Sequence, residues 1–214
     1  MSDLNKTIRP LDEGLFLVVS APSGTGKTSI CRQVLAQYPK IHFSVSYTTR
    51  PPRPGEVDGK DYHFISREEF QQRLARDEFA EWAENYGHFY GTSAETMKLL
   101  LHQGIDVMLD IEPRGAKALK EKFPGGVFVF ILPPTMDELK ARLNRRGFET
   151  PEVINRRFGK AVDEIKEVFW YDYTIFNDKL DIAVDQLRSI YITEKSRTTR
   201  LGARLQTFLE RENG

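Results

Sequence analysis

The sequence lacks the features that would place it in a membrane or outside the cell. It has a single cysteine, Cys31, so no disulfide can form within the chain, which is typical of a reducing compartment. It has no apolar run of about 18 residues, the length needed to cross a bilayer. Its first residues, 1–14, are polar and charged, without the apolar segment of a secretory signal. We therefore expect a cytoplasmic protein with no membrane partner.

The chain also lacks an excess of charge of either sign. Lys and Arg number 31, and Asp and Glu number 31, so the formal net charge is +0 at pH 7. Such a balance does not favour a nucleic acid polymer as a partner, and any phosphate chemistry must use local clusters of charge. The length of 214 residues suits one compact domain with a sizeable core.

Predicted strands alternate with helical patterns along most of the chain. The strands are expected at residues 15–19, 42–45, 105–111, 127–132 and 173–176. The first is a short, continuous apolar run, which is typical of a central strand whose two faces are both covered. This alternation predicts an α/β fold, a doubly wound parallel sheet of the P-loop type.

Residues 46–93 interrupt the alternation with short strands, loops and aromatic residues, and we interpret them as an inserted lobe. The predicted organisation is a polar N-terminal segment (1–13), one domain (14–193) and a helical extension (194–214). Within the domain we expect a core of about 14–45 and 94–193, the inserted lobe of about 46–93, and a small lid of about 144–156.

Local signals predict several helix ends. Ser66 and Thr135 each precede a Glu by three residues, the spacing of a capping box. Gly104 is expected just after a helix, and Pro113 in the first turn of another.

A glycine-rich segment follows the first predicted strand directly and opens the first helix. It comprises Ala21, Pro22, Ser23, Gly24, Thr25, Gly26, Lys27 and Thr28. Strand, loop and helix in this order are the context of a P-loop, where backbone N–H groups and a helix N-terminus bind phosphates. Lys27 would reach the β- and γ-phosphates of ATP, and the Thr28 hydroxyl would be a ligand of Mg²⁺. Ala21 stands where a P-loop has Gly, so its φ is expected to be negative.

Two arginines three residues apart indicate a second phosphate site. Arg50 and Arg53 lie in a segment stiffened by prolines. Guanidinium groups present paired N–H donors that suit a phosphate dianion. Tyr62 and Tyr90 lie downstream, with hydroxyls that can donate to the same phosphate.

This region resembles the guanylate kinase family. The family pattern is Ser-x-x-Thr-Arg-x-x-Arg-x-Gly-Glu followed by Gly-x-x-Tyr-x-Phe. It is matched by Ser46, Thr49, Arg50, Arg53, Gly55, Glu56, Gly59, Tyr62 and Phe64. Residues 79–83 and 90–93 are similar to the family's Glu-Trp-Ala and Tyr-Gly-Thr/Ser segments, and the similarity extends from about residue 15 to residue 187.

The resemblance implies a kinase that transfers the γ-phosphate of ATP to GMP or dGMP with Mg²⁺ as cofactor, giving ADP and GDP. It implies that Arg50, Arg53, Tyr62 and Tyr90 hold the GMP phosphate, and that Ser46, Glu81 and Thr92 contact guanine. The chemistry of Glu81 agrees. Guanine presents N1–H and N2–H₂ as adjacent donors for one carboxylate, whereas adenine lacks both, so Glu81 favours GMP over AMP.

Two carboxylates lie at the end of the predicted strand 105–111. Asp110 and Glu112 are placed where ligands bind in open α/β sheets. We expect both at the GMP site, and Asp110 also as a metal ligand. Arg114 stands where the family usually has Gln. The division of labour between the two carboxylates, and the effect of Arg114, stay open.

A cluster of basic residues predicts a lid over ATP. Arg142, Arg146 and Arg157 match arginines of the family and are, with Lys27, the catalytic candidates, because phosphoryl transfer depends on neutralising charge. Asn177 resembles an Asn that lies near the adenine in the family. No general base is expected, since the GMP phosphate is already largely ionised at neutral pH, and the histidines match no functional position.

Two other functions fit parts of the sequence. Guanylate-kinase-like domains of scaffold proteins bind phosphorylated peptides, usually with a degraded P-loop, whereas Lys27 and Thr28 are intact here. A kinase of a ribose phosphate would share the P-loop but should lack the guanine contacts Ser46 and Glu81. The oligomeric state, the role of the C-terminal extension, the kinetics and any monovalent-cation dependence stay open.

Overall fold

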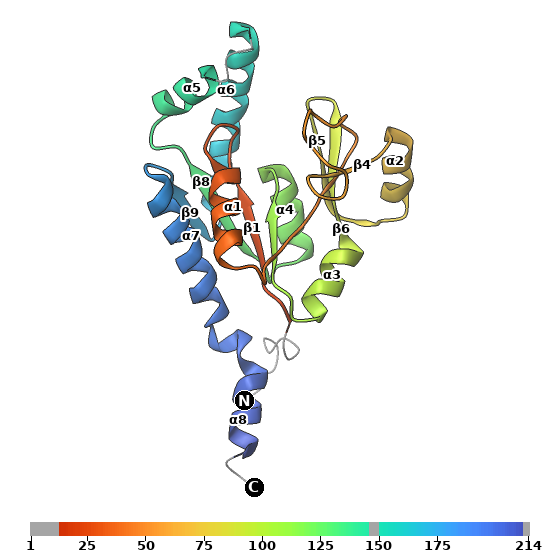
Figure 1. The fold of residues 1–214 in the computed structure, drawn as a ribbon, viewed down its shortest axis with the longest axis vertical. Coiled ribbons are helices and arrows are strands. Elements are labelled where there is room, and N and C mark those ends of the chain that lie inside the picture. Colours follow the sequence, from red (N-terminus) through yellow and green to blue (C-terminus); the bar gives the residue numbers. More distant parts are fainter. Residues whose placement is uncertain (1–12, 146–149, 212–214) are drawn as a thin grey trace.

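A computed structural model describes residues 13–145 and 150–211 of the chain. Its larger sheet has five parallel strands in the order β2-β7-β1-β8-β9 (Figure 1). They are β1 (Phe16–Ser20), β2 (His42–Phe43), β7 (Val107–Asp110), β8 (Val127–Leu132) and β9 (Tyr173–Phe176). The central position of β1 with strands added on both sides confirms the predicted doubly wound sheet.

Helices cover both faces of this sheet. One face packs against α1 (Lys27–Gln37) and α7 (Leu180–Lys195), and the other against α3 (Ala94–His102) and α4 (Pro113–Lys122). Leu15, Leu17 and Val19 enter the first core, while Phe16 and Val18 enter the second. Because successive strand residues point to opposite faces, both must be apolar here, which explains the unbroken apolar run.

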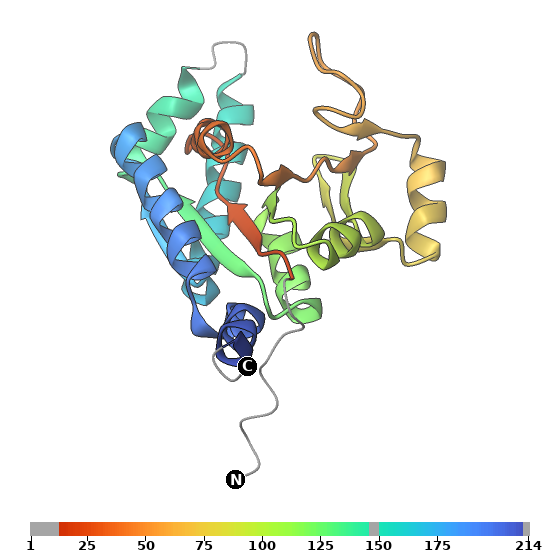
Figure 2. The ribbon, with the colours of Figure 1, turned by 60° about the horizontal axis from the view of Figure 1, so that its bottom comes forward.

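The inserted lobe contains a second, four-stranded sheet in the order β4-β3-β6-β5. Its strands are β3 (Tyr47–Thr48), β4 (His63–Phe64), β5 (Phe79–Asn85) and β6 (His88–Ser93), with helix α2 (Arg67–Ala75) beside them. Strands β5 and β6 form a hairpin whose turn residues, Tyr86 and Gly87, have φ of 49° and 79°. Positive φ at both turn positions suits the twist of a tight hairpin. Figure 2 shows this lobe on one side of β1 and the helices α5 (Met136–Asn144) and α6 (Pro151–Lys166) on the other.

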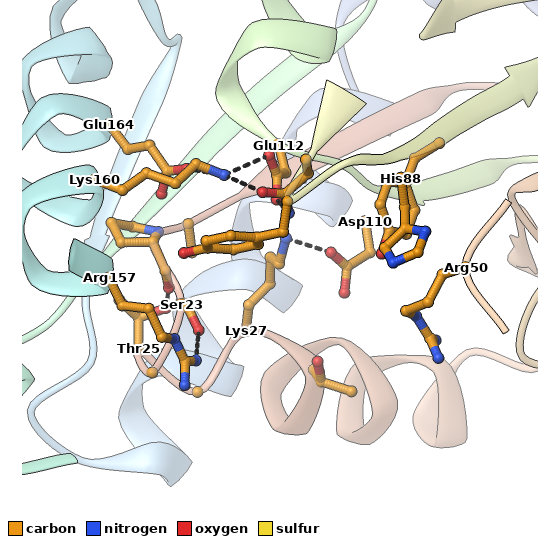
Figure 3. A pocket seen from close by; sticks show the side chains of 18 of the residues that line it. Ser23, Thr25, Lys27, Arg50, His88, Asp110, Glu112, Arg157, Lys160 and Glu164 are labelled. Atoms are coloured by element: carbon orange, nitrogen blue, oxygen red, sulfur yellow. Dashed lines mark hydrogen bonds and ion pairs between the residues drawn. The ribbon is translucent and has the colours of Figure 1, made fainter. Parts of the chain in front are cut away.

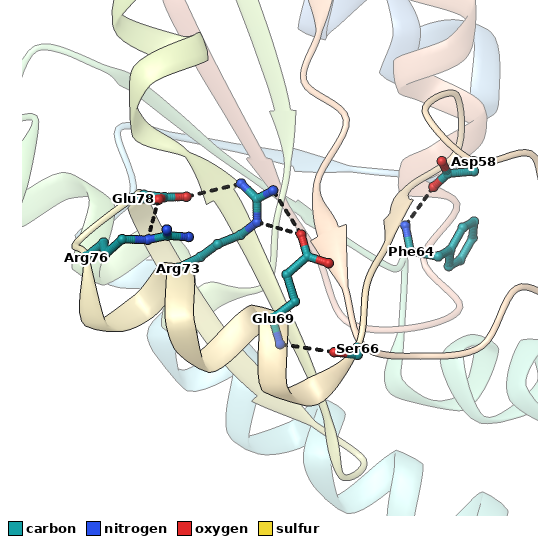
Figure 4. Close-up of polar contacts among 7 residues, drawn as sticks. All are labelled: Asp58, Phe64, Ser66, Glu69, Arg73, Arg76 and Glu78. Atoms are coloured by element: carbon teal, nitrogen blue, oxygen red, sulfur yellow. Dashed lines mark hydrogen bonds and ion pairs between the residues drawn. The ribbon is translucent and has the colours of Figure 1, made fainter.

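The predicted helix signals are confirmed. Ser66 Oγ accepts a hydrogen bond from Glu69 N at 3.0 Å (Figure 4), and Thr135 Oγ1 accepts one from Glu138 N at 3.1 Å. Pro113 is the first residue of α4, and Gly104 has a φ of 73° just after α3. Along α2, Arg73 also pairs with Glu69 and Glu78, which fixes the start of the following strand (Figure 4).

Some predicted boundaries are wrong. The strands expected at 42–45 and 105–111 are shorter in the structure. The hairpin β5–β6 was not predicted strand by strand. Its polar residues, such as Glu81 and Asn85, obscure the apolar pattern that identifies the strands of the larger sheet.

The described part of the predicted C-terminal extension is largely helical, up to Arg211. After α7 follow η3 (Thr198–Arg200) and α8 (Gly202–Arg211), and α8 lies beyond the end of α7, away from both sheets (Figure 1). A buried carboxylate, Asp106, fixes α7 to the sheet by accepting hydrogen bonds from Leu15 N, Tyr191 Oη and Lys195 Nζ at 2.7–2.8 Å. In residues 13–145 and 150–211, we find no helix with the length and apolar character that a membrane crossing requires.

Candidate functional site

The two predicted phosphate sites line one cavity. The cavity has a volume of about 740 Å³ and lies at the carboxyl ends of β1 and β7, between the inserted lobe and α6 (Figure 3). Of the residues predicted from the sequence, it is lined by Ala21, Pro22, Ser23, Gly24, Thr25, Gly26, Lys27, Thr28, Arg50, Arg53, Tyr62, Tyr90, Asp110, Glu112 and Arg157. These residues come from segments that lie far apart in the chain.

The glycine-rich loop between β1 and α1 has the curled backbone that a phosphate cradle requires. Gly24 and Gly26 have φ of 95° and 93°, in the left-handed region that favours glycine. At Gly26 a Cβ would also lie 2.5 Å from Asn177 Nδ2, so no larger residue fits. Within the described ranges, only Asp77 and Tyr86 are non-glycine residues with positive φ. Ala21 therefore has the negative φ expected of it.

Two of the predicted residues support this loop from outside the cavity. Asn177 is buried and donates from Nδ2 to the Thr25 carbonyl at 2.6 Å. Arg142 donates to the carbonyls of Thr25 and Asn177, each at 3.4 Å, and its Nε is paired with Glu138 at 2.8 Å. Neither residue lines the cavity. The structure therefore brings Asn177 and Arg142 to the outer side of the loop.

Lys27 and Asp110 form an ion pair at the floor of the cavity (Figure 3). Lys27 is the first residue of α1, and Asp110 ends β7 opposite Val19 of β1. Burial alone would lower the pKa of Lys27, but the Asp110 carboxylate raises it, and the net shift of this pKa is upward. Lys27 is therefore a fixed positive charge at neutral pH.

The two arginines of the lobe are held by a carboxylate from the same loop. Arg50 Nη2 pairs with Glu56 Oε1 at 2.9 Å, and Glu56 Oε2 accepts a hydrogen bond from Arg53 N at 2.8 Å. The hydrogen bond from Arg50 also keeps the pKa of Glu56 below its usual value. Tyr62 lies 5.3 Å from the Arg50 guanidinium, measured to the ring centroid. The loop thus presents Arg50 in a defined direction before any anion binds.

Three predicted residues, Ser46, Glu81 and Thr92, belong to the described part of the chain but do not line the cavity. Thr92 Oγ1 donates to Glu81 Oε1 at 2.6 Å, and both side chains are buried. Burial is the largest effect on the pKa of Glu81: hydrogen bonds from Thr92 lower this pKa and the nearby charge of Glu112 raises it, and the net result is about 7. Glu81 Oε2 also lies close to Gly115 of α4: a Cβ added to Gly115 would be only 2.2 Å from this oxygen. The structure therefore joins Glu81 to Thr92, and Ser46 lies just before β3.

Other residues line the cavity without having been predicted as site residues. From the hairpin tip these are Asn85, Tyr86 and His88, and from α1 and α6 they are Ser29, Val153, Arg156, Lys160 and Glu164. The α6 residues share a helix face with Arg157, so their three- and four-residue spacing is a signal that could have revealed them. No local signal reveals the hairpin tip, because only tertiary packing brings it to the cavity. Arg157 Nη2 donates to Ser23 Oγ of the loop at 2.5 Å (Figure 3), and Arg146 lies outside the described residues.

The arrangement suits the transfer of a phosphoryl group between two bound phosphates. The phosphate loop lies at one end of the cavity and the two lobe arginines lie at the other. Lys27 of the loop is paired with the Asp110 carboxylate. Within residues 13–145 and 150–211, no group of three or more His, Cys, Asp or Glu residues could hold a metal ion without further ligands.

The chain matches a family model described as "Guanylate kinase" over residues 14–194. It is 54% identical over 199 residues to a guanylate kinase of Syntrophus aciditrophicus, covering 93% of this chain and 96% of the relative. It is 51% identical over 189 residues to one of Geobacter sulfurreducens, covering 88% and 93%. The crystal structure of a guanylate kinase from Anaplasma phagocytophilum superposes with a TM-score of 0.74 at 34% identity, covering 88% and 90% of the two chains.

Proposed function

The chain belongs to the guanylate kinase family and is an enzyme of ATP-dependent GMP phosphorylation, and from this premise we propose which of its residues carry the reaction. The observation that carries the proposal is the single cavity lined by both the phosphate loop and the lobe arginines. ATP would occupy the loop end, and GMP or dGMP the lobe end. A phosphate oxygen of GMP then forms a bond to the γ-phosphorus of ATP, the bond from that phosphorus to the bridging oxygen breaks, and ADP leaves.

At the ATP end, residues 21–28 bind the phosphates through their backbone N–H groups and the N-terminus of α1. Lys27 neutralises charge on the transferring group. Arg157, bonded to Ser23, is placed to do the same from α6. Arg142 and Asn177 act by holding the loop, and Arg146 is proposed as a further lid arginine on its sequence position alone.

At the GMP end, Arg50, Arg53, Tyr62 and Tyr90 bind the phosphate, and Asp110 and Glu112 complete this end of the cavity. Ser46, Glu81 and Thr92 contact guanine. Glu81 accepts from the guanine N1–H and N2–H₂ groups, which requires its ionised form. No residue need act as general base, since the attacking phosphate is already an anion at neutral pH.

Guanylate kinases generally use ATP with Mg²⁺, and the residues present fit this ion. Mg²⁺ is usually bound by one or two carboxylates together with substrate phosphates, not by a cage of protein ligands. Asp110 and Thr28 line the same cavity and would hold it. When bound, the ion supplies positive charge that offsets the charge of the phosphates.

We also propose that the enzyme works in the cytoplasm, with nucleotides as its substrates. The support is the single cysteine, Cys31, which is buried and whose pKa is raised by burial, so it is a packing residue and not a reactive thiol.

The proposal is tested by initial rates with GMP, dGMP, AMP, CMP and UMP at fixed ATP and Mg²⁺. We expect GMP to be preferred strongly over AMP, CMP and UMP, and equal rates with GMP and AMP would refute the guanine assignment. Lys27→Ala should lower kcat by at least about 100-fold while calorimetry still detects GMP binding. Loss of GMP binding in a folded variant would mean that the two ends of the cavity are wrongly assigned.

The acceptor end is tested by Arg50→Ala, with Arg76→Ala as the matched control in the same lobe. Arg76 is exposed and pairs with Glu78 at the end of α2, away from the cavity. We expect Arg50→Ala to raise KM for GMP by about tenfold or more, because a charge-assisted hydrogen bond is lost, and Arg76→Ala to leave KM unchanged. The reverse result would contradict the acceptor site.

A further inference from the structure

Three side chains from three separate walls of the cavity contact one another in a closed ring. Asn85 ends β5 in the inserted lobe, Glu112 lies just before α4, and Lys160 lies on α6. Asn85 Nδ2 donates to Glu112 Oε1. Lys160 Nζ donates to Asn85 Oδ1 at 2.5 Å and to Glu112 Oε2 at 3.1 Å. Figure 3 shows Lys160 of α6 directed toward Glu112. Each member of this ring, which we call the Asn85–Glu112–Lys160 ring, therefore bonds the other two.

The ring fixes the direction of the Glu112 carboxylate. Each of its oxygens accepts one hydrogen bond, from a different element of the fold. An ionised carboxylate has about four lone-pair positions, so about two remain for a donor on a bound molecule. Glu112 lines the cavity beside the phosphate-binding residues. The carboxylate is thus already oriented, and it keeps acceptor capacity for a ligand in the cavity.

The tip of the lobe hairpin also rests on α6 through an aromatic contact. Lys160 Nζ lies 5.0 Å, and the Arg156 guanidinium 5.3 Å, from the centroid of the Tyr86 ring. Tyr86 holds a positive φ of 49°, a conformation that is uncommon for a side chain of this size. The polar ring and this cation–π contact together join the lobe to the helix.

The position of these groups favours a role in binding over a role in stability. The side chains of Lys160 and Glu112 are 36% and 35% exposed, and ion pairs at that exposure contribute little to folding. Lys160 keeps its charge, since the carboxylates of Glu112 and Glu164 raise its pKa by more than burial lowers it. Helix α6 also carries Arg157, which bonds Ser23 of the phosphate loop. One helix therefore contacts both ends of the cavity.

We propose that Asn85 and Lys160 are positioning residues for GMP: they orient Glu112 toward the acceptor nucleotide and hold the inserted lobe against α6. This rests on the proposed function of the cavity's lobe end as the GMP site. The two residues act through Glu112 and need not touch the substrate.

The test is steady-state kinetics on Lys160→Met, Asn85→Leu and the double variant, varying GMP at saturating ATP and then ATP at saturating GMP. Each single change should raise KM for GMP about tenfold, the loss expected for one hydrogen bond to a charged group. KM for ATP should stay within about twofold and kcat within about threefold. Because either change breaks the ring, the double variant should be little worse than a single one.

Matched variants separate this role from general damage. Lys166→Met removes an exposed lysine of the same helix, paired with Asp163, and should leave both KM values unchanged. Lys160→Arg keeps the positive charge and the N–H donors and should recover most of the GMP affinity. Asn85→Asp keeps the shape but replaces the donor to Glu112 with a carboxylate, so it should raise KM for GMP without unfolding the protein.

Three results would overturn the proposal: a KM for GMP in Lys160→Met equal to that in Lys166→Met, an equal rise in KM for ATP, or effects that multiply in the double variant. Failure of the proposed function gives a different pattern. In that case Arg50→Ala leaves KM for GMP unchanged as well. If KM for GMP rises with Arg50→Ala but not with Lys160→Met, only the proposed role of the ring is contradicted.

Discussion

Replacing Glu81 by Gln tests the most unusual carboxyl group of the site. The side chain is 5% exposed, and it accepts a hydrogen bond from a neutral donor, the Thr92 hydroxyl, at 2.6 Å. Burial, the largest effect, raises its pKa from 4.5 to about 7. One pKa unit corresponds to 1.36 kcal/mol. The rise therefore means that ionising Glu81 lowers the free energy of unfolding by about 3 kcal/mol.

The sign of the effect follows from which state binds the proton more tightly. Below about pH 4.5 the Glu81 carboxyl is protonated in both the folded and the unfolded chain and has no effect. Between about pH 4.5 and 7 the unfolded chain has lost this proton while the folded chain keeps it. The free energy of unfolding therefore falls as pH rises through this window, and the full penalty applies above about pH 7.

Glu81→Gln removes the titration and keeps an oxygen that can accept from Thr92. We expect the variant to be within about 1 kcal/mol of the wild type at pH 5, and more stable than the wild type by about 3 kcal/mol at pH 8. Urea unfolding at pH 5, 6, 7 and 8 measures the difference in the free energy of unfolding between the two proteins. The comparison holds if both proteins have the same slope of this free energy against urea concentration. Glu84→Gln, on the exposed face of the same strand, is the control and should show no such difference.

A stability difference between wild type and Glu81→Gln that is the same at pH 5 and pH 8 would refute the reasoning. The same variant also tests the guanine assignment. The Gln amide would place N–H donors against the donors of guanine, so KM for GMP should rise by about 100-fold or more. Wild-type affinity for GMP, measured by calorimetry, should weaken as pH falls below about 7, because the carboxylate that accepts from guanine becomes protonated. Unchanged GMP affinity in Glu81→Gln would mean that Glu81 does not read the base.

Three further substitutions have expected outcomes that separate the site from the scaffold. Gly115→Ala would place a Cβ 2.2 Å from Glu81 Oε2 and displace that carboxylate, so KM for GMP should rise about tenfold or more; an unchanged KM would contradict the role of this contact. Gly159→Ala, in open space on α6, should instead raise the free energy of unfolding by about 0.5–1 kcal/mol, as urea unfolding would show. Asp106→Ala removes the acceptor of three hydrogen bonds and should destabilise the fold by about 3 kcal/mol without changing either KM. The control, Asp185→Ala, alters an exposed residue of α7. An equal loss of stability in the two variants would contradict the contribution of the three hydrogen bonds to the buried Asp106.

The sequence by itself determined what depends on neighbouring residues. The phosphate loop was recognisable because its eight residues are consecutive, and the φ values of Gly24 and Gly26 follow from the residue type. Ser66 and Thr135 cap helices because each acts on an N–H three residues away. The strand 127–132 and the strand 173–176 were predicted with the bounds that the structure has, since an apolar run flanked by turn residues is a local signal.

Only the tertiary structure decided how distant residues meet. It placed Asn177 behind the phosphate loop, 152 residues from the carbonyl that it bonds. It buried Glu81, whose pKa depends on that burial and on no feature of its own segment. It also closed the Asn85–Glu112–Lys160 ring, whose members are 27 to 75 residues apart. Residue types and short spacings fix the backbone of a turn or a helix end, whereas burial and long-range hydrogen bonds depend on how the whole chain packs.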